Sequence, residues 1–108
     1  YSLNEIAAEK TVALLDRARS EPRDLYDLWY LTVSTKCVEL ADIADVIRGK
    51  LAFRNKSLND VRGEYGKKET RLQKAWKSRL SMHMSALPEF DGVYRAVKKA
   101  LRQAQITT

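Results

Sequence analysis

The chain has 108 residues, 44% of them hydrophobic, with only four Gly and two Pro, a composition that fits one folded domain and excludes a disordered chain. The single Cys37 excludes an internal disulfide, and one Cys beside one His, His83, gives no zinc-ligand pattern, so we expect a buried thiol in a cytoplasmic protein. No apolar run approaches the roughly 18 residues of a membrane span, so we expect no membrane partner.

The positive charge is concentrated in one part of the chain. The formal net charge is +6, but residues 1–47 have a net charge of −4, residues 48–79 of +8 and residues 80–108 of +2. A basic segment of this kind is typical of a protein with an acidic partner, most often nucleic acid. A solvated helix surface without a partner is the alternative on composition alone.

Two helices are predicted in the first third of the chain. Ser2 and Glu5 form a capping-box pattern that begins a helix over about residues 3–18. Its apolar stripe at helical spacing consists of Leu3, Ile6, Ala7, Ala13 and Leu14. A second helix begins near Pro22, with Ser20 as its N-cap, and ends within residues 32–35, where β-branched and polar residues follow one another.

Three more helical segments follow, and no strand is predicted. A third helix covers about residues 40–54 and stops near Asn55, and a cap pattern at Ser57 begins a long basic segment that Gly63 and Gly66 should kink or divide. A fifth helix begins after Pro88. Short connections favour antiparallel neighbours, so we predict an all-α fold, a compact bundle of about five helices forming a single domain over residues 1–108.

Two cations fall on the predicted apolar stripe of the first helix. Lys10 lies at its centre and Arg17 lies two turns later, about 20° away on the helical wheel. Lys and Arg are seldom buried without a partner. Asp24 borders the apolar stripe of the second helix, and Asp27 can pair with Arg23 at spacing i, i+4.

This pattern has two interpretations. In the first, Lys10 and Arg17 pair with Asp24 or Asp27 and hold an ion-paired helical hairpin together. In the second, the Lys ammonium and the Arg guanidinium form a cationic site for the phosphates of a nucleotide, with the carboxylates orienting them.

The same residues carry a family resemblance. Lys10-x-x-Ala13-Leu14-x-x-Arg17, followed by Arg23-Asp24-Leu25-Tyr26-Asp27-Leu28, resembles the C-terminal motifs of the nucleotidyltransferase toxins of abortive-infection toxin–antitoxin systems, the AbiEii/AbiGii type. Trp76 in a basic helix and Pro88-Glu89-Phe90 at the start of a final helix are similar to the tail of that family. The specific motifs lie in residues 5–31.

The resemblance implies a two-lobed enzyme that transfers a nucleotidyl group from a nucleoside triphosphate (NTP) to RNA, with tRNA as a possible acceptor, and that has an antitoxin protein as a partner. Mg²⁺ would be bound by a Gly-Ser and Asp-x-Asp segment that this sequence lacks, so the chain, which opens on Tyr1, is expected to be the C-terminal helical lobe of a larger enzyme and inactive alone. The implied catalytic residues are Lys10, Asp24 and Asp27, and the implied nucleotide-binding residues are Lys10, Arg17 and Arg23.

The basic segment is the predicted nucleic-acid-binding surface, since a basic helix can follow a phosphate backbone without reading bases. The residues assigned to it are Arg62, Lys67, Lys68, Arg71 and Lys74. An alternative function remains open at this point. The chain could be a non-enzymatic helical module that binds nucleic acid or a partner protein through this segment.

Overall fold

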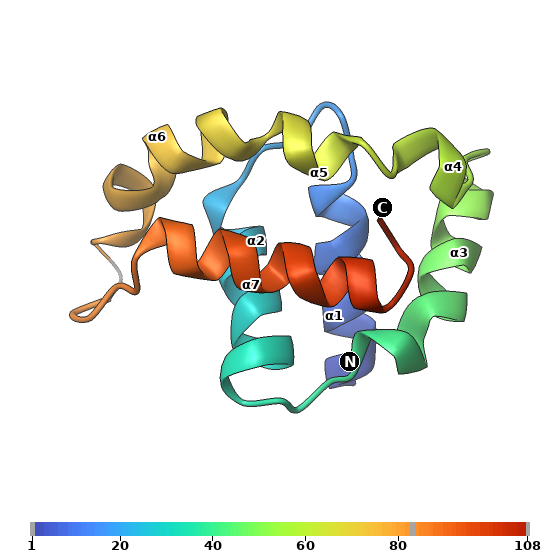
Figure 1. Cartoon of the computed structure of the whole chain (residues 1–108), viewed down its shortest axis with the longest axis horizontal. Coiled ribbons are helices and arrows are strands. Elements are labelled where there is room, and N and C mark those ends of the chain that lie inside the picture. The colour runs from blue at the N-terminus through green and yellow to red at the C-terminus, as the bar shows by residue number, and fades with distance from the viewer. Residues whose placement is uncertain (1, 83, 108) are drawn as a thin grey trace.

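The computed structural model describes residues 2–82 and 84–107, and these residues form helices and connecting turns without a strand (Figure 1). The all-α prediction is therefore confirmed. The elements in chain order are α1 (Leu3–Leu14), α2 (Pro22–Trp29), the π-helix η1 (Tyr30–Ser34), the 3₁₀ helix η2 (Leu40–Ile43), α3 (Ala44–Phe53), α4 (Leu58–Val61), α5 (Glu64–Lys67), α6 (Glu69–Leu80) and α7 (Phe90–Gln103).

Helix α2 lies at the centre of the arrangement and packs against α1, α6 and α7. In Figure 1, α7 crosses in front of α1 and α2, α4 to α6 follow the upper edge, and α3 closes one end beside α1. Leu25 and Leu28 of α2 are completely buried between these neighbours. Burying a Leu side chain stabilises a fold by roughly 1.5–3 kcal/mol, so these two residues anchor α2 in the core.

A second part of the core joins α5 and α6 to α7. The rings of Tyr65 and Tyr94 stack with centroids 4.6 Å apart, and the Tyr65 hydroxyl donates a hydrogen bond to the Tyr94 carbonyl at 2.8 Å. Trp76 is buried edge-on against Phe90, and its Nε1 donates to the Pro88 carbonyl at 2.9 Å. These contacts fix the basic helices α5 and α6 onto the bundle.

Helix α1 is shorter than predicted, and its buried face is different. It ends at Leu14 rather than near residue 18, and the Asp16 carboxylate accepts a hydrogen bond from the Ala18 amide at 3.0 Å. Asp side chains that bond to nearby backbone in this way favour turns over helix. Leu3, placed in the predicted stripe, is 47% exposed, whereas Ala8, Thr11, Val12 and Leu15 are buried. Lys10 therefore lies at the edge of the buried face and not at its centre.

The fourth predicted segment accounts for the larger number of helical pieces, because it is divided into α4, α5 and α6. The predicted division near the two glycines is confirmed, with Gly63 as the N-cap of α5. Ser57 and Asp60 form the predicted capping box of α4, in which the Ser57 amide donates to the Asp60 carboxylate at 2.8 Å. The estimate of about five helices was therefore too low.

Three smaller predictions differ from the structure or lie outside it. Glu21, not Ser20, is the N-cap of α2, with Pro22 at the first helical position. Cys37 is exposed, so the expectation of a buried thiol is wrong. His83, which with Cys37 gives no zinc-ligand pattern, lies outside the described residues. No helix of the described part is long and apolar enough to cross a membrane.

Candidate functional site

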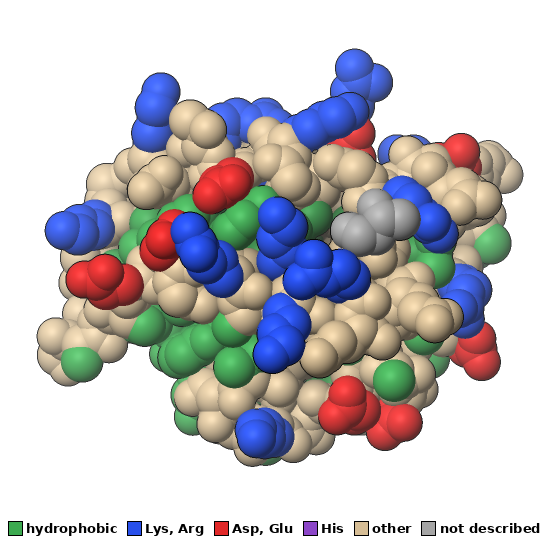
Figure 2. All heavy atoms as spheres, in the orientation of Figure 1, with side chains coloured by type: hydrophobic (Ala, Val, Ile, Leu, Met, Phe, Trp, Pro, Cys, Tyr) green, Lys and Arg blue, Asp and Glu red, His purple; other side chains and the backbone are tan. Residues whose placement is uncertain are grey.

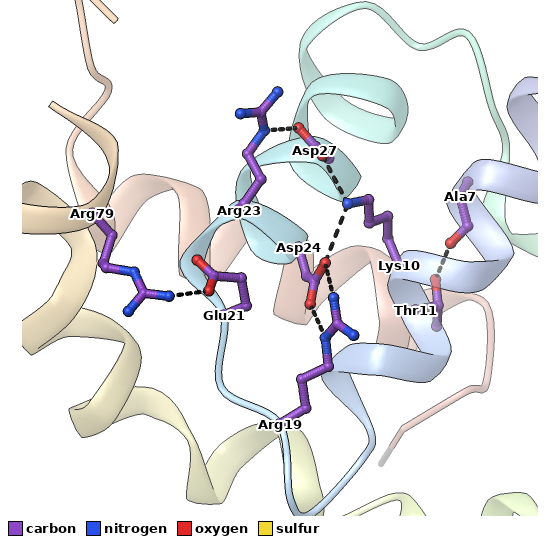
Figure 3. Close-up of polar contacts among 9 residues, drawn as sticks. All are labelled: Ala7, Lys10, Thr11, Arg19, Glu21, Arg23, Asp24, Asp27 and Arg79. Atoms are coloured by element: carbon purple, nitrogen blue, oxygen red, sulfur yellow. Dashed lines mark hydrogen bonds and ion pairs between the residues drawn. The ribbon is translucent and has the colours of Figure 1, made fainter. Parts of the chain in front are cut away.

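The candidate site lies between α1 and α2, where Lys10 faces two carboxylates (Figure 3). Its Nζ atom is 3.2 Å from Asp24 Oδ1 and 3.0 Å from Asp27 Oδ2. Residues three apart on a helix lie on the same side, so α2 presents both carboxylates to the same point on α1. The structure thus brings together the three residues that the sequence singled out as catalytic.

Asp24 is the most buried member of this group, with 1% of its surface exposed. Besides Lys10, it accepts hydrogen bonds from Arg19, whose Nε is 2.8 Å from Oδ2 and whose second terminal nitrogen is 3.4 Å from Oδ1. A buried carboxylate needs such partners because desolvation strongly disfavours an unpaired charge. Asp24 therefore connects α1, the following loop and α2.

Asp27 extends the network towards solvent. It accepts from Lys10 and from Arg23, whose Nε is 3.0 Å from Asp27 Oδ1. The pairing of Arg23 with Asp27 at spacing i, i+4 is as predicted from the sequence. The outer side of the network is exposed, since about half of the Arg23 side chain is accessible to solvent.

Arg19, and not Arg17, contacts the acidic residues of the site. The prediction that Arg17 shares the stripe with Lys10 is wrong, because α1 ends before it and Arg17 is exposed in the loop. Arg19 takes the contact to Asp24 instead. The sequence signal for Arg19 is its place in the short connection before Asp24, whereas the spacing of a longer helix favours Arg17.

The carboxylates keep Lys10 charged. Partial burial alone would lower the pKa of Lys10, but the hydrogen bonds from its ammonium to Asp27 and Asp24, together with their negative charges, outweigh this effect and raise the pKa above its ordinary value. The Lys10 side chain is 25% exposed, so part of it remains accessible to solvent. A charged and oriented ammonium of this kind can bind an anion.

A cavity of about 160 Å³ opens beside the network. Lys10, Arg19 and Arg54 contribute cations to its wall, and Glu9, Asp16 and Asp24 contribute carboxylates. The contacts agree with the ion-paired hairpin, and the cavity gives a ligand access to the same cations. The ion-paired hairpin is therefore present with Arg19 in place of Arg17, and the interpretation as a phosphate site stays a prediction.

These residues do not fit a Mg²⁺ site. Asp24 and Asp27 already accept hydrogen bonds from Lys10, Arg19 and Arg23, and three cations around two carboxylates repel a further cation. Within residues 2–82 and 84–107, no group of three or more His, Cys, Asp or Glu side chains is placed to hold a metal ion.

Four of the five predicted nucleic-acid contacts lie at the surface or at its margin. Lys67, Arg71 and Lys74 are exposed and Arg62 is half-buried. Figure 2 shows Lys and Arg side chains along the upper edge of the molecule, over α5 and α6. Lys67 pairs with Glu64 at 3.3 Å, which offsets part of its charge.

The prediction that Lys68 belongs to the nucleic-acid-binding surface is wrong, because Lys68 is completely buried. Its Nζ donates to the Ala13 carbonyl in the last turn of α1 at 3.0 Å, and the same carbonyl also accepts from the Asp16 amide at 3.2 Å. Burial lowers the pKa of Lys68 to about 8. Its contact ties the start of α6 to α1, and it offers no charge to a nucleic acid.

Comparison with known proteins supports one family. The family model described as "Nucleotidyl transferase AbiEii toxin, Type IV TA system" matches residues 1–103, which confirms the resemblance seen in the sequence. Searches of curated proteins and of solved structures gave no match.

Proposed function

Because the chain belongs to the nucleotidyl transferase AbiEii toxin family of type IV toxin–antitoxin systems, we propose that it forms the helical lobe of a nucleotidyltransferase and provides part of the NTP site. The observation that carries the proposal is Lys10, held between Asp24 and Asp27 at the edge of a cavity, within the residues that the family model matches. The ion pairs alone would hold a hairpin together. A charged Lys10 in the wall of a cavity favours an anionic ligand such as phosphate.

In the proposed mechanism, Lys10 binds the phosphates of the NTP and offsets the negative charge that develops as pyrophosphate leaves. Fixed cations aimed at developing charge lower the barrier because they need no reorganisation during the reaction. Asp24 acts as a positioning residue, since it is buried and holds both Lys10 and Arg19. Asp27, nearer to solvent, orients Lys10 from the other side.

The proposal also covers two exposed arginines, the metal ion, the acceptor and the partner protein. Arg23 and Arg17 are exposed and can meet the outer phosphates or the acceptor. Mg²⁺ is proposed to bind to carboxylates outside this chain, because Asp24 and Asp27 are already neutralised. The proposed acceptor is RNA, which would lie along Arg71 and Lys74, and an antitoxin protein is the proposed regulatory partner.

Replacement of Lys10 by Met is expected to lower kcat/KM for incorporation of labelled nucleotide into RNA by tenfold or more, because the variant keeps the aliphatic stem and loses the charge. The measurement uses the full-length protein. Lys50→Met is the matched control, since Lys50 is 24% exposed and also contacts two carboxylates, Glu5 at 3.1 Å and Glu9 at 2.6 Å.

Equal activity of the folded Lys10→Met and Lys50→Met variants would reject Lys10 as part of the nucleotide site. The second candidate function, a non-enzymatic module that binds nucleic acid, rests on the exposed cations of α5 and α6. This second function predicts RNA binding that weakens as salt is added, and no nucleotidyl transfer by the full-length protein with any nucleotide.

A further inference from the structure

A separate and larger pocket lies between α3, α4 and the C-terminal end of α7. Its volume is about 730 Å³, and it has no lining residue in common with the cavity beside Lys10. Arg48, Lys56, Arg62 and Arg102 contribute four cations to its wall, and no Asp or Glu lines it. Polar side chains complete the lining, among them Ser57, Asn59, Gln105 and Thr107.

Among the residues that the structure describes, most of this positive charge has no ion-pair partner. Arg48 pairs with Asp45 at 2.6 Å on the exposed side of α3. Within the part of the chain that the structure describes, no carboxylate lies within ion-pair distance of Lys56, Arg62 or Arg102. Three like charges around one pocket repel one another, so an anion between them would be stabilised.

Arg62 provides an independent sign of a missing partner. Its Nε atom is buried and has no hydrogen-bond acceptor within the described residues. A buried donor left without a partner costs about 1–3 kcal/mol. Arg62 also lines the pocket, and turning its side chain towards a phosphate seated there would expose Nε and allow the bidentate binding that Arg favours.

The local backbone holds the cations in place. Asn55 has a φ of 59° and reverses the chain after α3, and the Lys56 amide bonds to the Leu51 carbonyl at 2.9 Å. Arg102 lies in the last turn of α7, where it also offsets the partial negative charge of the helix end. That role accounts for Arg102 alone. It does not account for Arg62, which is the C-cap residue of α4 and does not belong to α7.

We propose that this pocket binds a phosphate group in the backbone of an RNA strand, which then runs from the pocket over Lys67 towards Arg71 and Lys74. Arg62 connects the two regions, because it lines the pocket and directly follows α4, the helix before α5. The inference rests on the proposed RNA acceptor and gives that acceptor a fixed point of attachment. The cations of α5 and α6 alone would leave the strand free to slide.

The test measures binding of a short single-stranded RNA to the protein over a range of salt concentrations, with no NTP present. Arg102→Gln and Lys56→Gln are each expected to weaken binding about threefold to tenfold near physiological salt and to reduce the slope of log K against log salt by about 0.7. Lys99→Gln is the matched control. Lys99 is an exposed cation of α7 that lines a different pocket, beside η1 and η2.

A second readout uses the unmodified protein and avoids any loss of folding in a variant. The amide NMR signals of Asn59 and Thr107, which line the pocket, are expected to shift when the RNA is added. Unchanged Asn59 and Thr107 signals, or equal effects of Arg102→Gln and Lys99→Gln, would overturn the proposal. The RNA-binding assay contains no NTP and no transfer step. A negative result in it therefore does not affect the Lys10→Met prediction, and a failure of the Lys10→Met prediction does not affect the RNA-binding result.

Discussion

Replacement of Asp24 by Asn is expected to lower the free energy of unfolding by about 2–3 kcal/mol, one of the two largest effects expected in this protein. The substitution preserves the shape of the side chain and removes its charge, so Lys10 and Arg19 lose their shared counter-charge. Breaking a fully buried pair typically costs about 3–5 kcal/mol. The value here is smaller because Arg19 is 55% exposed and solvent can stabilise it.

Chemical denaturation measures this effect, and Asp45→Asn is the matched control. Asp45 also accepts from an Arg, but its side chain is 96% exposed. The control is expected to change the free energy of unfolding by less than about 0.5 kcal/mol. Equal losses in the two variants would show that Asp24 does not hold the hairpin together.

The second large effect concerns Lys68 and pH. The pKa of Lys68 is about 8 in the folded protein and 10.5 for an ordinary Lys, because burial disfavours the charged form; the charge of Asp16 opposes this lowering and that of Arg71 adds to it. Between these values the unfolded chain binds more protons than the folded chain, so stability rises with pH. The expected gain from about pH 7.5 to about pH 9.5 is roughly 2 kcal/mol.

Other groups set the upper limit of this pH range. Partial burial lowers the pKa of Lys10, but its carboxylate contacts outweigh this and raise it, so the contribution of Lys10 to stability is lost only above about pH 10.5. Burial raises the pKa of Tyr94 to about 12. Lys68→Met is expected to lose the rise, and Lys67→Met, at an exposed neighbouring position, is expected to keep it. A rise that persists unchanged in Lys68→Met would show that Lys68 is not its source.

The sequence predicted the hairpin site better than it predicted the geometry of α1. Asp24, Asp27 and Lys10 meet as expected, because i, i+3 spacing on α2 and a short connection leave little freedom. Arg17 was placed wrongly because Asp16 caps a turn and ends the helix early, and helical periodicity contains no information on that competition.

Burial of basic residues was the other part that the sequence could not supply. Lys68 and Lys67 are adjacent in one basic run, yet one is buried against the Ala13 carbonyl and the other is exposed. The distinction depends on how α6 packs over the end of α1, which is a tertiary contact across 55 residues. The pocket around Arg62 and Arg102 depends in the same way on contacts between elements far apart in the chain.

The most direct test of the central claim is the affinity of the full-length protein for an NTP, compared between Lys10→Met and Lys50→Met. Both variants remove one partly exposed ammonium that contacts two carboxylates on or near α1. If Lys10 binds the phosphates, Lys10→Met weakens NTP binding by about tenfold, equivalent to roughly 1.4 kcal/mol, and Lys50→Met leaves it unchanged. Equal affinity of the two folded variants and the unmodified protein would contradict the assignment and leave the cluster as an ion-paired hairpin alone.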